Sequence, residues 1–533
     1  MYDLVLKKGR IIDGTGNPSY KADIGIKESK IAKIGKISSN DAQEIIDAKG
    51  LIVSPGFIDA HSHDDLLLLM DPSNISKIAQ GVTTTIIGNC GVSPAPVNNE
   101  TLEQLKQYTS FLSLGMDIKW DWTSFGEYLN RLETLKLGVN VAALVGHGTI
   151  RIAIMDMDDR KPTWEELGRM KRILAQSMEE GAVGMSTGLT FPPGAYAGTN
   201  ELIELCKVVA KYGGIYVSHI RGESWALINA VNEALEIGTK AKIPVEISHY
   251  KACGSKNWSK IKETLRIIEK ARAKGIDITA DQYPYTAGSI ALMEILPPWA
   301  QAGGVNKLIE RIQNSKERQK IKKDLEGGKD WENYATSCGW ENIKIICSLK
   351  NPDLEGKSIA EISELKNKDP CDVVFDLIVE ENGATLVALH EMNENGMRKI
   401  MKHPAVMVES DGVPVGVRGK AHPRLYGTFP RVLGKYVREE KVLTLKDAIR
   451  KMTSLPAWRF GIRNKGLLRK GMDADITVFN PKIVKDRATY EQPNLPPEGI
   501  EYVIVNGRVA IEKGQLTKFR SGKVLRKNKY RAL

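Results

Sequence analysis

The sequence predicts an α/β protein whose central part is a (β/α)8 barrel of the TIM type, flanked by β-strands from both ends of the chain. Two observations lead to this fold class. Short apolar segments in the middle of the chain alternate with stretches of helical pattern, and repeated βα units of this kind form parallel sheets. Short strands separated by turns occur in the first fifty residues and again after residue 473. They predict one small β-sandwich built from both ends.

The candidate barrel strands are apolar along their length and end in polar residues, as expected of strands buried on both faces. They span residues 51–58, 81–88, 139–145, 182–187, 214–218, 244–248, 276–281, 384–389 and 405–409. A barrel of this type has eight strands, so one of these segments is misassigned or belongs to an insertion. The helix predicted over 164–180 begins with a capping box formed by Thr163 and Glu166 and stops at Gly181.

These patterns divide the chain into three parts. We expect residues 1–54 to form the N-terminal part of the sandwich, residues 55–462 to form the barrel, and residues 463–533 to form the C-terminal part of the sandwich with a basic tail. From about residue 290 to 350, a charged helix and a tryptophan-rich piece interrupt the alternation of strands and helices. We interpret this segment as an insertion on the catalytic rim that serves as a lid.

Composition predicts a cytoplasmic globular protein. Hydrophobic residues make up 42% and charged residues 26% of the chain, as in ordinary globular proteins. No apolar run approaches the roughly 20 residues of a membrane span, and the first residues lack the apolar core of a signal peptide. We therefore expect no membrane association. The six cysteines include no CxxC pair, which favours free thiols in a reducing compartment.

The net charge of +11 is spread over the chain, with the densest basic segment near residue 533. No aromatic-interleaved or helix-turn-helix pattern accompanies this charge, so we expect no nucleic-acid partner. A solvated tail is the favoured interpretation of this segment, which contains Lys518, Arg520, Lys523, Arg526, Lys527, Lys529 and Arg531.

Side chains that bind metals follow several candidate strands, at the end of the barrel where enzymes of this fold place their active sites. His61 and His63 follow the first strand, and as alternate residues of an extended segment they point to the same side. The others follow the strands at 81, 214, 244 and 405, and they are Cys90, His219, His249 and Asp411. Each has an ordinary alternative: a packed thiol, hydrogen-bonded core histidines, or an aspartate in a turn. Their joint occurrence at strand ends favours a metal site.

The motifs around these residues resemble those of the amidohydrolase superfamily, and within it the N-acyl-D-amino-acid deacylases (D-aminoacylases). Cysteine after the second strand is the most specific sign. Hydantoinases and dihydroorotases bridge their metals with a carboxylated lysine after the fourth strand, whereas this chain has Met185-Ser186-Thr187 there. The resemblance covers nearly the whole chain and rests on Pro55-Gly-Phe-Ile-Asp-Ala-His-Ser-His-Asp-Asp65, Gly88-Asn-Cys-Gly91, Gly181-Ala-Val-Gly-Met-Ser-Thr-Gly188, Ser218-His-Ile-Arg-Gly-Glu223, Ser248-His-Tyr-Lys251, Tyr283-Pro-Tyr-Thr-Ala-Gly-Ser289, Ser410-Asp-Gly412 and His422-Pro-Arg-Leu-Tyr-Gly-Thr-Phe-Pro-Arg431.

The resemblance implies a zinc enzyme that hydrolyses small-molecule N-acyl-D-amino acids. It implies one tight Zn²⁺ site made by Cys90, His219 and His249. It also implies a second, weaker metal position made by His61 and His63, together with Cys90 and Asp411. In this scheme Asp411 accepts the proton of the attacking water and passes it to the departing amine, because an amide anion is a poor leaving group.

The resemblance also implies residues that contact the substrate. Arg424 is the expected bidentate partner of the substrate carboxylate, and Lys251, Tyr283 and Ser289 are the expected further contacts. Phe191 stands where many relatives have a tyrosine that helps to hold the carboxylate, and Tyr196 is a candidate to replace it. No arginine follows Ser289, where members acting on acidic substrates have one, which favours hydrophobic D-amino acids.

Three alternatives stay open from the sequence. A cyclic-amide hydrolase of the hydantoinase or dihydroorotase kind is disfavoured by the missing bridging lysine. A D-peptidase would need an anionic group to receive the free amine of its substrate, and no motif identifies one. A metal-binding scaffold protein without activity would have no need of an acid beside the metal, so Asp411 argues against it.

Overall fold

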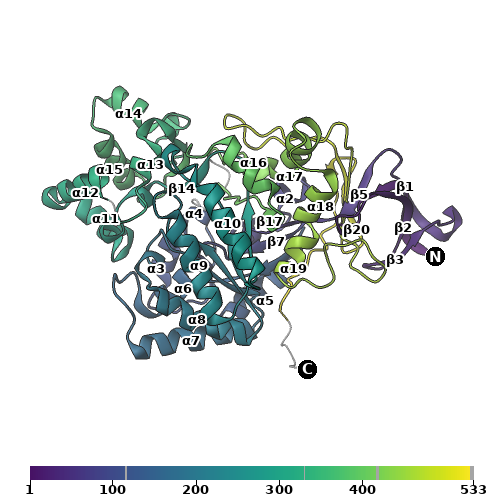
Figure 1. Ribbon diagram of the computed structural model, residues 1–533, viewed down its shortest axis with the longest axis horizontal. Helices are drawn as coiled ribbons and strands as arrows, with labels where there is room; N and C mark the ends of the chain where they lie inside the picture. The colour runs from purple at the N-terminus through teal and green to yellow at the C-terminus, as the bar shows by residue number, and fades with distance from the viewer. Residues whose placement is uncertain (114–116, 329, 416–418, 528–533) are drawn as a thin grey trace.

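The computed structural model describes residues 1–113, 117–328, 330–415 and 419–527. Three parts follow one another along the long axis of the molecule (Figure 1). Strands from the N-terminal region lie at one end, the barrel lies in the middle, and the helices α11 (Gly304–Gln313), α12 (Ser315–Gly327), α14 (Ile359–Lys366) and α15 (Pro370–Glu380) lie at the other end.

The central part is a ring of parallel strands in two arcs. One arc contains three strands, which are β6 (Phe57–Asp59), β7 (Val82–Ile87) and β8 (Asn140–Ala143). The other contains β9 (Val145–Gly146), β10 (Gly184–Gly188), β11 (Ile215–His219), β12 (Val245–Ile247), β13 (Ile278–Gln282) and β17 (Val406–Val408).

Both junctions between the arcs are connected. Only Leu144 separates β8 from β9, so these two segments are one interrupted strand. At the other junction, the Asp411 amide donates to the His61 carbonyl at 2.9 Å, and the His63 amide donates to the Gly412 carbonyl at 3.1 Å. The predicted fold class, a (β/α)8 barrel, is confirmed.

The ninth candidate strand lies outside the barrel. β16 (Leu386–Leu389) pairs antiparallel with β14 (Gly288–Ala291) and with β15 (Ile343–Cys347) in a separate sheet. The excursion from the barrel therefore continues past residue 350 to β16. An apolar run of this length does not reveal its partner strands, because it fits a parallel barrel strand and a strand buried under helices equally well.

Strands from both chain ends form one continuous sheet of nine strands. The link between the ends is the antiparallel pair of β5 (Ile52–Pro55) and β18 (Ile476–Phe479). Their apolar side chains are buried on both sides, so neither end would keep its core without the other. The remaining strands are β1 (Tyr2–Ile11), β2 (Tyr20–Lys27), β3 (Lys30–Gly35), β4 (Ala42–Asp47), β19 (Ile500–Val505), β20 (Arg508–Glu512) and β21 (Gln515–Leu516).

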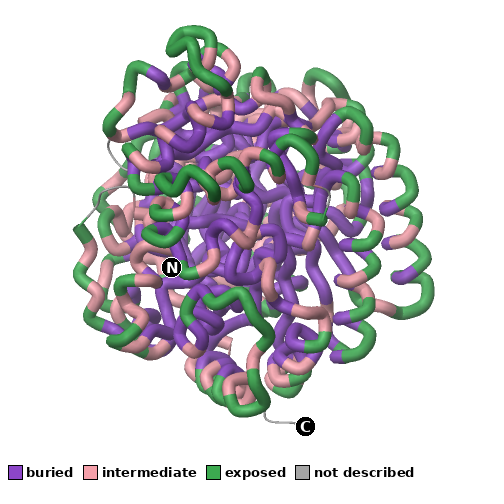
Figure 2. Tube along the Cα trace, turned by 90° about the vertical axis from the view of Figure 1, so that its left-hand side faces the viewer, coloured by how far each residue is buried: buried purple, intermediate pink, exposed green. Residues whose placement is uncertain are grey.

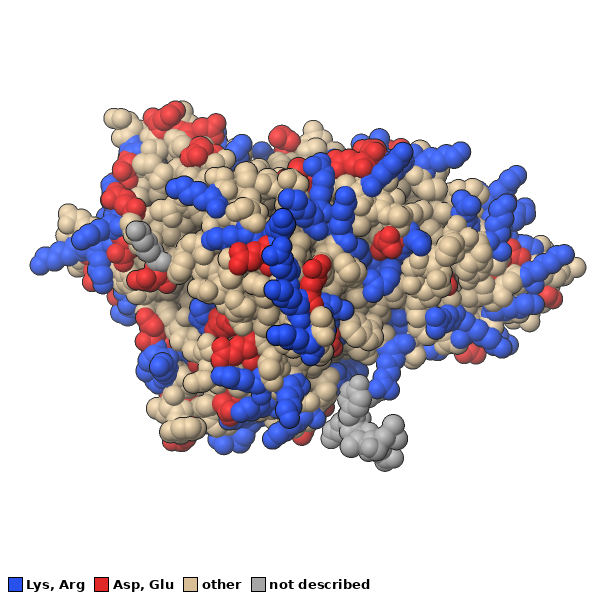
Figure 3. Space-filling model, in the orientation of Figure 1, with Lys and Arg blue, Asp and Glu red and all other residues tan. Residues whose placement is uncertain are grey.

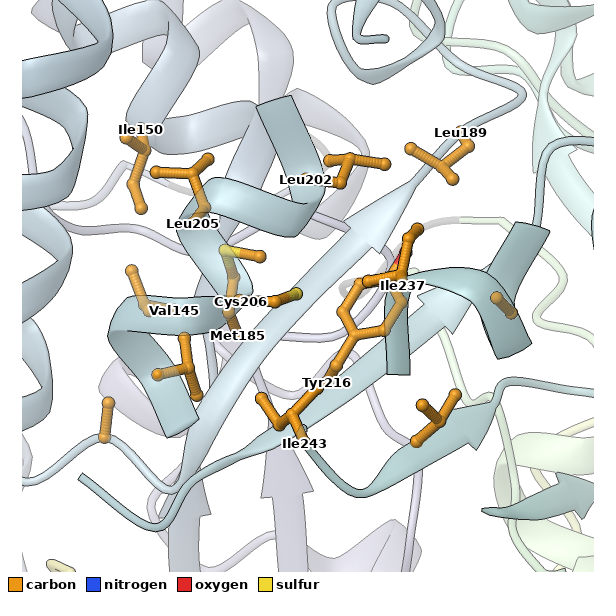
Figure 4. Packing of buried hydrophobic residues seen from close by; sticks show 14 of the residues in the cluster. Val145, Ile150, Met185, Leu189, Leu202, Leu205, Cys206, Tyr216, Ile237 and Ile243 are labelled. Atoms are coloured by element: carbon orange, nitrogen blue, oxygen red, sulfur yellow. The ribbon is translucent and has the colours of Figure 1, made fainter. Parts of the chain in front are cut away.

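Amphipathic helices hold the barrel strands in place, and α8 (Thr199–Lys211) is an example. Its apolar residues recur at helical spacing and face the sheet, where Leu202, Leu205 and Cys206 pack near Met185 and Tyr216 of β10 and β11 (Figure 4). Buried segments accordingly fill the interior, while the outer turns of the helices are exposed (Figure 2). This packing gives the strand ends a rigid base.

The molecular surface mixes both signs of charge. On the face shown in Figure 3, Lys and Arg side chains are interspersed with Asp and Glu. No helix in the described part of the chain combines the length and the apolarity needed to cross a bilayer.

The basic tail packs on the barrel, so the prediction of a solvated tail is wrong for residues 521–527. Val524 forms a parallel bridge with Val141 of β8, and Arg526 donates to Glu133 at 2.9 Å and to the Glu180 carbonyl at 2.9 Å. The prediction missed this because the free edge of β8 is visible only in three dimensions. Lys529 and Arg531 lie outside the described residues.

Removal of residues 521–533 should destabilise the barrel. Four backbone hydrogen bonds join its described residues, 521–527, to residues 137, 141 and 181. At about 1 kcal/mol each, their loss would lower the free energy of unfolding by about 4 kcal/mol. Thermal and urea denaturation followed by circular dichroism measure the change. Lys518→Ala, which alters an exposed side chain just before the segment, is the control. Equal stability of the truncated and complete chains would show that the segment contributes nothing.

Candidate metal centre

Three histidine rings surround the sulfur of Cys90 at the C-terminal end of the barrel. The Cys90 Sγ lies 3.3 Å from His61 Nε2, 3.5 Å from His249 Nε2 and 3.8 Å from His219 Nδ1. Two groups of donor atoms are close enough to hold a metal ion, one from His61, His63 and Cys90 and the other from Cys90, His219 and His249. The Cys90 sulfur belongs to both groups. Five of the six predicted metal-binding side chains therefore form two adjoining candidate sites.

Unusual backbone conformations aim several of these side chains. Cys90, His249 and Asp411 have φ angles of 51°, 34° and 43°. Residues other than glycine rarely adopt this left-handed region, and such conformations persist where the surrounding structure enforces them, most often at functional sites. Each of the three stands where a barrel strand passes into its loop, so the chain turns sharply and directs the side chain over the barrel mouth.

Contacts with neighbouring side chains orient the rings of His219 and His249 toward the sulfur. His219 Nε2 lies 2.8 Å from the Thr190 hydroxyl, and His249 Nδ1 lies 3.0 Å from Glu223 Oε1. These contacts leave His219 Nδ1 and His249 Nε2 free to bind a metal. Partners of this kind orient metal-binding histidines and select their tautomer.

The chemistry of these donors fits zinc. Thiolate and imidazole are its common protein ligands, and three of them are the number found in catalytic sites. Burial raises the pKa of Cys90 well above its usual value, so a bound cation is what would stabilise its thiolate. Burial also lowers the pKa of His219 and His249 well below the usual value, which keeps both rings neutral with a lone pair available.

Asp411 connects the metal donors to a buried arginine. Its Oδ1 lies 3.3 Å from His63 Nε2, and its Oδ2 lies 2.9 Å from Arg424 Nη1. Burial raises the pKa of Asp411, but the charge of Arg424 and the neighbouring imidazoles of His63 and His61 outweigh this effect and hold that pKa well below its usual range. Asp411 is therefore a carboxylate at neutral pH and able to accept a proton.

Arg424 lies behind Asp411, with its guanidinium 4.6 Å from the centre of the Tyr283 ring. The side chain is fully buried, and its three guanidinium nitrogens have no aligned hydrogen-bond partner among the described residues. A buried donor group without acceptors is costly, so this guanidinium has the capacity to bind a further anion.

One pocket brings most of the predicted site residues together. It encloses about 920 Å³, part of which is open to solvent. His61 and Arg424 are not among its lining residues. The other eight predicted residues line it, which are His63, Cys90, His219, His249, Lys251, Tyr283, Ser289 and Asp411. Much of the remaining wall is apolar, formed by Val92, Phe111, Phe191, Ile290, Ala291, Met293, Leu386, Leu389 and Val413.

The structure separates Phe191 from its proposed replacement. Phe191 lines the pocket and packs edge-on against His219, with ring centres 4.8 Å apart. The Tyr196 hydroxyl instead donates to the Pro298 carbonyl at 2.7 Å, and Tyr196 does not line the pocket. The expectation that Tyr196 replaces the missing tyrosine is therefore wrong, because its ring is held against the insertion.

Sequence analysis missed several residues of the site. Glu223 ends the motif that begins at Ser218, and an acid four residues after a candidate ligand would have been a signal for a supporting role. Thr190, Glu294 and Glu391 carried no such signal. Thr190 reaches His219 from the loop after β10. Glu294 and Glu391 line the pocket from the segments that follow β14 and β16.

Loss of the Cys90 sulfur should release the metal. Cys90→Ala removes the donor common to both groups, and zinc affinity should fall by about 100-fold or more, beyond the effect of losing an outer partner. Elemental analysis after dialysis against a chelator measures retained zinc. The matched control is Cys206→Ala, a buried cysteine in the packing of α8, which should keep its zinc. If both variants retained zinc, the metal would be bound by residues other than Cys90.

Comparisons with known proteins agree with this geometry. The amidohydrolase family model matches residues 44–511. The chain is 38% identical over 531 residues to an N-acyl-D-glutamate deacylase of Alcaligenes xylosoxydans xylosoxydans. This match covers 99% of this chain and 97% of the relative. It is also 36% identical over 529 residues to a D-aminoacylase of the same organism. This match covers 98% of this chain and 97% of the relative. The crystal structure of N-acyl-D-glutamate deacylase from Bordetella bronchiseptica, complexed with zinc and a phosphonate inhibitor, matches with a TM-score of 0.84 at 35% identity, over 98% of this chain and 99% of that chain. The chain therefore belongs to the amidohydrolase family.

Proposed function

We propose that this protein is a zinc-dependent hydrolase that cleaves the amide bond of N-acyl-D-amino acids to a carboxylate and a free D-amino acid. The observation that carries the proposal is the joint placement of Cys90, His219 and His249 beside the ionised carboxylate of Asp411 in one pocket. The full-length relatives support the substrate class, since they are deacylases of N-acyl-D-amino acids. The Bordetella enzyme was solved with zinc and a mimic of its tetrahedral intermediate.

Asp411 is the residue that moves the proton. When held by Cys90, His219 and His249, zinc would supply Lewis acidity to the amide carbonyl and the attacking water. Asp411 Oδ1 faces the metal donors, whereas Oδ2 stays with Arg424. Oδ1 would therefore accept the proton of the water and later deliver it to the amide nitrogen, which must leave as a neutral amine.

Arg424 and Tyr283 would hold the substrate carboxylate. Both are buried. The Tyr283 hydroxyl has no hydrogen-bond partner among the described residues, and the Arg424 guanidinium has only its ion pair with Asp411 and no aligned hydrogen bond. Lys251 is different, because its ammonium donates to Glu223 Oε1 at 2.7 Å and to the His249 carbonyl at 3.1 Å. We assign Lys251 mainly to the support of His249, and Ser289 to a contact on the pocket wall.

Turnover of one enantiomer tests the proposal. Zinc-loaded protein should release amine from N-acetyl-D-methionine and not from N-acetyl-L-methionine, because the full-length relatives are deacylases of N-acyl-D-amino acids. The apolar wall should accept the methionine side chain. Amine release measured by fluorescence gives the rates. Absence of turnover for both compounds, with zinc bound, would contradict the proposed function.

Asp411→Asn should stop the reaction without unfolding the site. The amide is nearly isosteric but accepts no proton, so kcat should fall by about 10²–10⁴-fold, the usual contribution of general acid–base catalysis. Zinc held by Cys90, His219 and His249 should remain. The control is Asp353→Asn, at an exposed position. Near-normal kcat in the Asp411 variant would refute its role as the proton acceptor.

A further inference from the structure

Glu391 is a buried acid in the pocket without a charged partner among the described residues. It follows β16, its side chain is only 3% exposed, and it lines the same pocket as Cys90, His249 and Asp411. Its Oε2 has no hydrogen-bond partner, and no basic side chain forms an ion pair with it, in the part of the chain that the structure describes. Buried ionisable groups normally have both.

Buried acids of the same insertion differ from Glu391 in the donors around them. Glu381 accepts hydrogen bonds from the Ser348 hydroxyl and from the Leu349 and Lys350 amides. Glu332 Oε2 accepts from the amides of residues 223 and 224, although its Oε1 has no partner among the described residues. Glu391 accepts from no backbone amide in the described part of the chain, so its carboxylate is less supported than either of these.

The cations around the pocket are already engaged. Arg424 pairs with Asp411 at 2.9 Å, and Lys251 pairs with Glu223 at 2.7 Å. Burial raises the pKa of Glu391 to about 8, although the charge of Lys251 and the thiol of Cys253 act in the opposite direction. An added cation would favour its ionised form, whereas an added carboxylate would face an uncompensated acid.

A small residue keeps space open beside Glu391. Gly288 begins β14, at the border between the barrel and the helical insertion (Figure 1). A Cβ atom at this position would lie 3.2 Å from Glu391 Oε1 and 3.3 Å from the Tyr283 hydroxyl. The two oxygens therefore converge beside Gly288, and all three residues line the pocket. An ammonium group has three donors and no acceptor, and both oxygens are able to accept from it.

We propose that Glu391, with Tyr283, binds a primary ammonium group on the substrate. This rests on the proposed function and names the substrate class of the same site. The ammonium is carried either by the D-amino acid side chain, as in lysine or ornithine, or by the acyl part, as in an aminoacyl group. The second source makes the protein a D-peptidase and supplies the anionic group that no sequence motif identified. Substrates with acidic side chains are disfavoured.

Steady-state kinetics on four compounds test the inference. N-acetyl-D-methionine is the neutral reference, N-acetyl-D-lysine places the ammonium on the side chain, β-alanyl-D-methionine places it on the acyl part, and N-acetyl-D-glutamate is the acidic comparison. At least one ammonium compound should have a kcat/KM at or above that of the reference. N-acetyl-D-glutamate should be turned over least.

The decisive readout is the ratio of kcat/KM for the preferred ammonium compound to that for N-acetyl-D-methionine. Glu391→Gln should lower this ratio by about tenfold or more, because it removes the charge partner and keeps the shape. The matched control is Glu294→Gln, a second acid of the pocket wall that has the Gln301 amide beside it. The ratio should change by less than about threefold in this control.

Two results would overturn the inference while leaving the proposed function intact. One is turnover of N-acetyl-D-methionine with neither ammonium compound accepted. The other is an unchanged ratio in Glu391→Gln, or a ratio that falls only in Glu294→Gln. Turnover of the reference by each variant, with normal zinc content, excludes misfolding as the cause. If no N-acyl-D-amino acid is turned over, the proposed function fails as well, and the inference falls with it.

Discussion

The cost of burying a thiol among imidazoles underlies the whole active end of the barrel. Cys90 sits with three histidine nitrogens within 3.8 Å of its sulfur, in surroundings that disfavour its charged form. Hydrogen bonding among neutral groups satisfies such a cluster only in part. A divalent cation resolves it, because it stabilises the thiolate and uses the lone pairs of the rings. Thr190 and Glu223 contact the rings of His219 and His249 and hold them in this arrangement.

The cost of burying polar groups without partners also shapes the junction between the last barrel strand, β17, and the first, β6. Ser410 donates from its amide to Asp59 Oδ1 at 2.9 Å and from its hydroxyl to Asp59 Oδ2 at 2.6 Å, and Lys77 pairs with Asp59 at 2.8 Å. All three side chains are fully buried. Removing any member would leave an uncompensated buried group. This network ties β17 to β6 and so sets the distance from Asp411 to His61 and His63.

Sequence reasoning predicted the parts of the site that depend on local order along the chain. His61 and His63 share a side because extended residues alternate, and Cys90, His219, His249 and Asp411 follow strand ends that a parallel barrel gathers at one mouth. The separate position of β16 and the packing of residues 521–527 depend on partners far away in the chain, and no local period encodes them. Arg424 was predicted as a carboxylate ligand, but its ion pair with Asp411 follows from tertiary contact. No sequence motif pointed to Glu391, because its proposed role rests on the absence of a charged partner among the described residues, which only the structure reveals.

The contacts of residues 521–527 have a consequence for biosynthesis. This segment completes the hydrogen bonding of β8 and packs beside Gly181, before β10, yet it leaves the ribosome after every barrel strand has been made. β18, the partner of β5, is likewise translated after the barrel. Domains generally fold as units during synthesis, which requires that all their parts have left the ribosome. Here the earliest and the latest segments must meet, so the nascent barrel stays unfinished, with an open strand edge, until translation reaches the last strands.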